Sequence, residues 1–135
     1  MKKTILVFIS LVVFSTGITS CNNTIDNSIT PIYTENTIKI GALFSYTTGD
    51  WSTLGKTSKS ALDIASVKIN AYLASINSNN RISITYSDTY LNSDSALAQI
   101  KRFYANGIRI IIGPQSSSEV AKIKSFVDST GMIVI

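Results

Sequence analysis

The sequence predicts an α/β protein in which a parallel sheet carries helices on both faces, giving three layers. Four segments of β-branched, apolar or alternating residues are separated by three segments whose apolar residues recur at three- and four-residue steps. Turn-forming Gly, Asn and Ser residues lie at the boundaries. This βαβαβαβ order favours parallel strands joined by right-handed crossovers, and we expect the strand order 2-1-3-4.

The first two expected strands flank a long helix. Residues 37–44 (TIKIGALF) form an apolar, β-rich run, and residues 45–53 (SYTTGDWST) form a loop. A helical pattern follows until residues 77–80 (NSNN), and residues 81–87 (RISITYS) alternate as a half-buried strand does. The expected inward face of this helix consists of Leu62, Ala65, Ile69, Tyr72, Leu73 and Ile76.

A second helix and a buried strand come next. Asn92 or Ser93 is the expected N-cap of the helix, and Asn106-Gly107 stops it. Residues 108–112 (IRIII) are close to a continuous apolar run, which predicts a strand covered on both faces. The expected apolar face of the helix consists of Ala96, Leu97, Ile100, Phe103 and Tyr104.

The last unit is a loop at residues 113–118 (GPQSSS), a helix at residues 119–129 and the start of a strand at residues 132–135, with Gly131 ending the helix. In a parallel sheet, ligands bind outside the carboxyl ends of the strands where the strand order reverses. The loops after the first and third strands therefore form the expected binding edge. The residues expected to face inward from this helix are Val120, Ile123 and Val127.

The N-terminus has the pattern of a secretory signal peptide over residues 1–20. Two lysines precede an apolar run at residues 4–14, and small residues complete the segment. The apolar run is too short to span a bilayer as a mature helix, which needs about 20 apolar residues. A buried N-terminal helix is the alternative. The polar residues 16–27 argue against it, because they continue no helix and offer no cap.

Cys21 ends the motif Ile18-Thr19-Ser20-Cys21, which resembles the lipobox of bacterial lipoproteins. The resemblance implies cleavage before Cys21, a lipid on this residue, and a membrane-anchored location in the cell envelope that faces the periplasm or the cell exterior. A secreted protein with an incidental cysteine is the alternative, but Cys21 is the only cysteine, and a free exported thiol is a liability. Residues 21–36, rich in Asn, Thr and Ser, are interpreted as a flexible tether to a domain at residues 37–135.

Composition argues against several classes of function. The 135 residues carry a net charge of +4, but loss of Lys2 and Lys3 leaves ten basic against eight acidic side chains with no basic run, so no nucleic-acid partner is expected.

The absence of histidine and the single cysteine argue against zinc and thiol chemistry. The loop SYTTGDWSTLG lacks the G-x-G-x-x-G pattern of a dinucleotide site. Asp50 and Asp88 near strand ends could do acid–base work, but such residues more often cap helices or face solvent, so no enzyme, metal or cofactor is expected.

Two separated motifs lie in residues 38–70 (IKIGALFSYTTGDWSTLGKTSKSALDIASVKIN) and residues 110–135 (IIIGPQSSSEVAKIKSFVDSTGMIVI). Both resemble the type I periplasmic binding proteins of branched-chain amino-acid transporters, the Leu/Ile/Val-binding family. The resemblance implies that residues 37–135 are the N-terminal lobe of a two-lobe ligand clamp, truncated within that lobe. We expect the chain to be a fragment, and a truncated gene is the alternative. It also implies a lipid-anchored solute-binding protein that captures an amino acid or amide for an ABC uptake transporter, with the permease subunits as partners. A ligand-sensing receptor domain of the same fold, not coupled to transport, is the alternative.

The resemblance implies that a serine of the third loop touches the ligand. Ser117 matches the family serine that holds the ligand's α-carboxylate, and Ser116 and Ser118 flank it. Unpaired N–H groups at the start of the following helix would add donors there. The alternative role for a serine at this place is to cap the helix. We expect one serine to cap and another, Ser117, to face the ligand.

The first loop is the second implied contact. Trp51 and Leu54 lie where family members place an aromatic or apolar side chain against the ligand. Leu54 stands at a position that is often aromatic, and Trp51 is expected to substitute for it. The alternative for Trp51 is an exposed loop aromatic that closes the edge of the lobe. Gly49 and Gly55 are expected to serve a turn and a close approach of the helix.

Overall fold

The computed structural model describes residues 35–135, so the expected signal peptide, Cys21 and most of the tether lie outside the described residues. Four strands form one parallel sheet in the order β2-β1-β3-β4, which confirms the expected order. Element boundaries agree with the predicted ones to within two residues. The strands are β1 (Asn36–Phe44), β2 (Asn80–Asp88), β3 (Ile110–Ile112) and β4 (Ile133–Val134).

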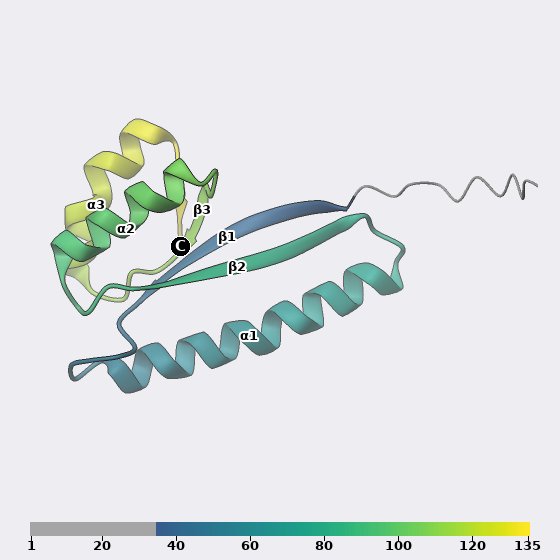
Figure 1. Cartoon of the computed structure of the whole chain (residues 1–135), viewed down its shortest axis with the longest axis horizontal. Coiled ribbons are helices and arrows are strands. Elements are labelled where there is room, and N and C mark those ends of the chain that lie inside the picture. The colour runs from purple at the N-terminus through teal and green to yellow at the C-terminus, as the bar shows by residue number, and fades with distance from the viewer. Residues whose placement is uncertain (1–34) are drawn as a thin grey trace, which may run out of the picture. The chain divides into compact units, whose positions relative to one another are not determined.

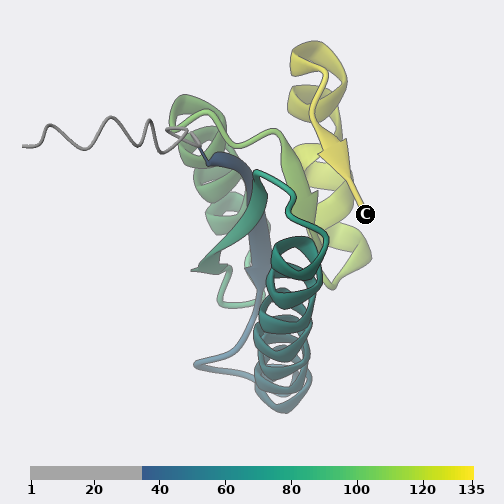
Figure 2. The same ribbon diagram turned by 90° about the vertical axis from the view of Figure 1, so that its right-hand side faces the viewer.

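Helices cover both faces of the sheet, as predicted. Helix α1 (Ser52–Ser75) lies on one face, and α2 (Ser93–Ala105) and α3 (Ser117–Thr130) lie on the other (Figure 1). The crossover from β1 to β2 runs along the sheet in the opposite direction to the next two crossovers, so right-handed connections place α1 alone on its face. In the turned view, α3 and β4 lie side by side (Figure 2). No helix within residues 35–135 is long and apolar enough to cross a membrane.

The hydrophobic core fills the layer between the sheet and the α2–α3 pair. Leu43 of β1 and Ile111 of β3 are completely buried there. Gly41 allows the ring of Phe103 to lie against β1, because a Cβ at Gly41 would lie only 2.7 Å from that ring. The predicted inward face of α2 is confirmed, since three of its residues are buried and two pack against the core. On α3 the prediction is wrong for Val120, which is exposed, while Ile123 is buried and Val127 is partly buried.

The predicted inward face of α1 is only partly correct. Leu73 and its neighbours at helical spacing are half-buried, but Ile69, Tyr72 and Ile76 are exposed, Tyr72 to 64%. The physical reason is the position of α1, which packs mainly over β2 and less over β1. Its other flank faces the β3–β4 half of the sheet, which no helix within residues 35–135 covers on this side.

Isoleucines line this open side of the sheet. Register partners in a parallel sheet point to the same face, so Ile110 and Ile133 lie together there, and Ile135 follows two residues later. Ile135 is 78% exposed. The prediction that the third strand is covered on both faces is therefore wrong for the described residues. Ile111 is buried on the α2–α3 side, but Ile110 and Ile112 are only half-buried on the other.

Polar contacts join α1 to β2 beside its half-buried apolar residues. The Asn70 side chain donates to the carbonyl of Ile82 at 3.0 Å and accepts from its N–H at 2.8 Å. The Tyr86 hydroxyl donates to Asp63 at 2.7 Å, and Asp63 pairs with Lys59 at 2.8 Å. The Lys59 ammonium also lies 4.4 Å from the centre of the Tyr86 ring. These contacts fix the rotation of α1 over the edge strand.

Gly55 brings the first turn of α1 against the loop after β1. A Cβ at Gly55 would lie 1.9 Å from the carbonyl oxygen of Ser45, and Gly55 is the one buried residue of α1. Gly49, in the same loop, has a φ of +83°, which glycine adopts without strain. The predicted structural roles of both glycines are confirmed.

Gly55→Ala is expected to destabilise the lobe, although alanine is the better helix former by about 1 kcal/mol. The added methyl group meets the Ser45 carbonyl, and overpacking of this kind costs about 1–3 kcal/mol. Urea unfolding monitored by circular dichroism measures the change. Lys56→Ala, at the exposed neighbouring position, is the matched control and should have little effect. A higher free energy of unfolding for Gly55→Ala would contradict the close approach.

The raised pKa of Tyr86 leads us to expect a loss of folding stability at alkaline pH. Burial, then the hydrogen bond to Asp63 and the charge of its carboxylate, raise the Tyr86 pKa above the usual 10.0. The stabilisation is therefore complete below pH 10.0 and is lost as the pH rises through the raised pKa. Tyr86→Phe should remove this part of the pH dependence, whereas Tyr72→Phe, at an exposed position, should leave it. Measurements of the free energy of unfolding from pH 8 upward test this expectation. Equal pH profiles of that free energy for the wild type and Tyr86→Phe would refute it.

Candidate functional site

Three loops meet at the carboxyl ends of the parallel strands: residues 45–51 after β1, residues 89–92 after β2 and residues 113–116 after β3. All three lead directly into a helix, so the N-termini of α1, α2 and α3 point to this edge. Backbone N–H groups of a first helical turn lack partners within the helix. The edge is thus rich in hydrogen-bond donors before any side chain is considered.

Asp88, the last residue of β2, holds two of these loops together. Its carboxylate accepts from the N–H of Thr47 at 3.0 Å, from the Thr47 hydroxyl, and from the N–H of Tyr46 at 3.4 Å. It also accepts from the N–H of Tyr90 at 2.8 Å, and Asp88 is only 8% exposed. These contacts give Asp88 a structural role, which sequence reasoning missed. The feature of the sequence that could have indicated this role is a carboxylate directly at the end of an alternating strand.

The loop after β2 has an unusual backbone conformation. Tyr90 and Leu91 have φ values of 55° and 52°, in the left-handed region that residues with a Cβ rarely adopt. The Asp88 carboxylate accepts from the N–H of Tyr90, and the Thr89 carbonyl accepts from the N–H of Asn92 at 2.9 Å. Asn92 then caps α2 by accepting from the N–H of Ser95 at 2.9 Å. The structure therefore identifies Asn92 as the cap, one of the two predicted candidates.

Ser116 is the N-cap of α3. Its hydroxyl accepts from the N–H of Glu119 at 3.3 Å and donates to the Glu119 carboxylate at 2.8 Å. The same carboxylate oxygen accepts from the N–H of Ser116 at 3.4 Å, which completes a capping box. Glu119 is 1% exposed, and its other oxygen, Oε1, has no hydrogen-bond partner within residues 35–135. Ser116 is thus engaged by its own helix.

Ser117 and Ser118 are exposed on the first turn of α3. The Ser118 hydroxyl lies 3.2 Å from that of Ser116. The Ser117 hydroxyl is at the positive end of the α3 dipole. One serine of this turn caps the helix, as expected, and Ser117 is exposed. The expected contact of Ser117 with a ligand stays a prediction.

Gln115 connects this serine turn to α1. Its side-chain amide donates to the hydroxyl of Ser58 at 3.1 Å, while its Oε1 is buried without a partner within residues 35–135. Ser58 lies one helical turn after Leu54, and Trp51 occupies the residue before α1. The predicted contact residue Leu54 therefore lies on the helix that Gln115 joins to the serine turn, and Trp51 lies directly before that helix. Nothing in the sequence pattern indicated this link.

Trp51 and Leu54 are 38% and 50% exposed, so both large side chains remain open to solvent at the start of α1. Trp51 does not cap the helix with its side chain. In the same loop, burial raises the Tyr46 pKa, and the charge of Asp88 adds to this effect. No group of three His, Cys, Asp or Glu side chains within the described part of the chain could hold a metal ion.

The edge therefore combines helix N–H donors, an exposed serine hydroxyl and exposed apolar surface. Such a set can accept a small molecule that carries a carboxylate beside an apolar part. Asp50 lies in the exposed turn before Trp51.

The sequence comparisons identify a relative of unknown function. No family model matches the chain. An uncharacterized protein of the archaeon Methanocaldococcus jannaschii is 32% identical over 101 residues, which are 75% of this chain and 24% of that protein.

Solved structures match over nearly the whole described region. The branched-chain amino-acid transporter substrate-binding protein LivJ of Streptococcus pneumoniae, in complex with isoleucine, superposes with a TM-score of 0.64 at 20% identity, over 73% of this chain and 28% of LivJ. A type 1 periplasmic binding protein of Bordetella pertussis gives 0.62 at 28% identity, over 73% and 26%. The leucine-binding protein LivK of Thermotoga maritima gives 0.62 at 18% identity, over 72% and 26%. The chain spans about a quarter of the length of these proteins, and its described residues have the fold of a lobe of a type I periplasmic binding protein.

Proposed function

We propose that residues 37–135 form the N-terminal lobe of a solute-binding protein that captures a small amino acid or amide for an ABC uptake transporter. The observation that carries the proposal is the exposed Ser117 at the N-terminus of α3, on the carboxyl edge of this lobe fold. The comparisons support it, since the neighbouring structures include transporter proteins that bind leucine or isoleucine.

Ser117 is the proposed contact for the ligand's carboxylate. The cap uses the Ser116 hydroxyl, whereas the Ser117 and Ser118 N–H groups begin the helix and have no intrahelical acceptor. A carboxylate there would gain the helix dipole and charge-assisted hydrogen bonds. Each hydrogen bond to a charged group contributes about 1.5–3 kcal/mol. Ser118 is the second donor on the same turn.

Trp51 and Leu54 are the proposed apolar contacts. Both are exposed on the lobe itself, and a ligand side chain laid against them would remove apolar surface from water. The edge is open, so a second surface is needed to exclude water from the carboxylate. We propose that a second lobe supplies this surface and closes over the edge.

We further propose that a lipid on Cys21 anchors the lobe through the tether at residues 21–36, in the cell envelope. One acyl chain holds a protein only marginally at a membrane, and two or three chains hold it firmly. Anchoring would keep the binding protein beside the permease subunits that receive its ligand.

Calorimetry of the protein expressed from its complete reading frame, against a panel of amino acids and amides, tests the function. Saturable binding of at least one member is expected. Ser117→Ala should weaken that binding about tenfold or more, because one charge-assisted hydrogen bond is lost. Binding of no member would refute the proposed function, and an unchanged affinity would refute the role of Ser117.

Ser116→Ala is the matched control, since the two serines are adjacent and differ in role. It should lower the free energy of unfolding by about 0.5–2 kcal/mol, the usual effect of losing an N-cap, and it removes a partner of the buried Glu119 carboxylate. Ser117→Ala should leave stability nearly unchanged. If Ser117→Ala destabilised the fold as much as Ser116→Ala, its effect on binding would be structural.

Cys21→Ser should release the protein from the membrane fraction. Labelling cells with a clickable palmitate analogue should mark the wild type and not the variant, because the thiol is the proposed acceptor of the lipid. Cell fractionation followed by in-gel fluorescence measures both properties. Equal labelling of the two proteins would show that the lipid is elsewhere.

A further inference from the structure

Gln115 lies between the two groups of residues that the proposed site combines. It directly precedes the serine turn (residues 116–118), and Ser117 follows two residues later. Its side-chain amide donates to the Ser58 hydroxyl of α1 at 3.1 Å. Leu54 lies four residues before Ser58, on the same face of that helix. The face of α1 that carries Leu54 is therefore turned toward the serine turn.

The hydrogen bond between Gln115 and Ser58 is the one direct polar link, within residues 35–135, between α1 and the chain from β3 onward. The other polar contacts of α1 lead to β2, through Asn70 and Tyr86. Gly55 determines how closely the first turn approaches the loop after β1. The position of α1 relative to the start of α3 is therefore fixed by the Gln115 side chain.

The Gln115 amide is satisfied at only one of its two ends. Its nitrogen donates to Ser58, while its Oε1 is buried without a partner within residues 35–135. A buried acceptor without a partner lowers folding stability, and an apolar side chain would avoid that loss. The stability of the lobe therefore does not explain a glutamine at this place. A role in holding α1 at a set distance from the serine turn does explain it.

We infer that Gln115 is a specificity-determining residue, which sets the side-chain length of the amino acid held at the carboxyl edge; this inference rests on the proposed function. The proposed carboxylate contact, Ser117, begins α3, whereas the proposed apolar contacts, Trp51 and Leu54, lie at the start of α1. A ligand that touches both groups spans the space between the two helices. The hydrogen bond from Gln115 to Ser58 fixes this span. One missing or extra methylene in an apolar site changes affinity about tenfold or more, so a fixed span selects one length.

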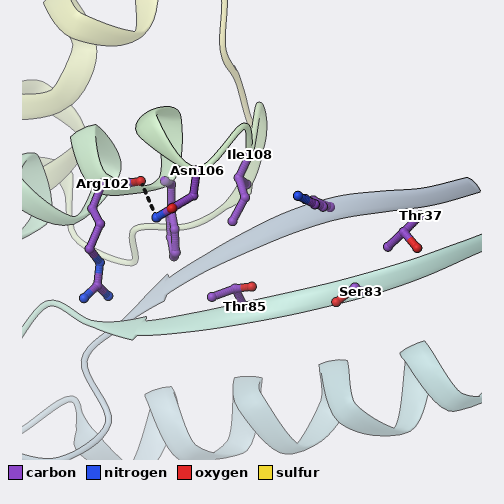
Figure 3. A pocket seen from close by; sticks show the side chains of 8 residues that line it. Thr37, Ser83, Thr85, Arg102, Asn106 and Ile108 are labelled. Carbon is purple, nitrogen blue, oxygen red and sulfur yellow. Dashed lines mark hydrogen bonds between the residues drawn. The ribbon is translucent and has the colours of Figure 1, made fainter.

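A second hydrogen bond between a glutamine and a serine provides a matched control. On the other face of the sheet, the Ser87 hydroxyl of β2 donates to Gln99 of α2 at 2.8 Å. Figure 3 shows Arg102 extending from the same helix toward β2, where its guanidinium donates to Ser87 at 2.9 Å. Gln99 thus joins a helix to a serine as Gln115 does, but its partner belongs to none of the proposed ligand contacts.

Calorimetry of the protein expressed from its complete reading frame tests the inference, with a panel of amino acids and amides whose side chains range from alanine to phenylalanine. Gln115→Ala should weaken the tightest ligand about fivefold and lower the discrimination against longer side chains about threefold, because one neutral hydrogen bond that holds the span is lost. Ser58→Ala should have the same effect, and the double variant should be no weaker than either single variant. Ser58→Thr keeps the hydroxyl and should restore both quantities.

Gln99→Ala should leave affinity and discrimination at the wild-type values. Urea unfolding of Gln115→Ala should give a free energy of unfolding close to that of the wild type, because removal of the unpaired oxygen offsets the lost hydrogen bond. Unchanged affinities or equal weakening of every ligand by Gln115→Ala, or an altered discrimination by Gln99→Ala, would overturn this inference and leave the proposed function standing. Binding of no panel member by the wild type would overturn the proposed function, and this inference with it.

Discussion

The carboxylate of Asp88 is the contact on which the carboxyl edge of the lobe depends. It accepts from backbone N–H groups of the loops after β1 and β2, while its own backbone pairs with Phe44 at the end of β1. Hydrogen bonds to an ionised acceptor are stronger than neutral ones, and several converge here in a nearly buried place. The loop from Tyr46 leads to α1, and the loop from Tyr90 leads to α2. One side chain thereby sets where two helices begin relative to the sheet.

The helices on the two faces of the sheet make different kinds of contact with it. On one side, α2 and α3 enclose an apolar core around Phe103 and Ile111. On the other side, α1 is attached to β2 by Asn70 and by the Tyr86–Asp63–Lys59 contacts. Helix α1 lies off-centre, over the edge strand. This position leaves the isoleucines of β3 and β4 open on that side.

The carboxyl edge offers hydrogen-bond donors to an anion through its backbone. The donors are backbone N–H groups oriented by α3, and the Ser116 capping box fixes the first turn that presents them. The edge therefore offers well-oriented partial charges rather than charged side chains.

Local patterns were enough to predict the order of elements, the buried face of α2 and the roles of Gly49 and Gly55, because periodicity and turn chemistry are properties of neighbouring residues. The identification of Ser116 as the cap required the backbone of the turn, since neighbouring serines offer the same hydroxyl in a sequence. The exposure of Tyr72 and the hydrogen bonds of Asp88 to two loops depended on how distant segments pack. Register and helix position arise from contacts between residues far apart in the chain, and the tertiary structure alone decides them.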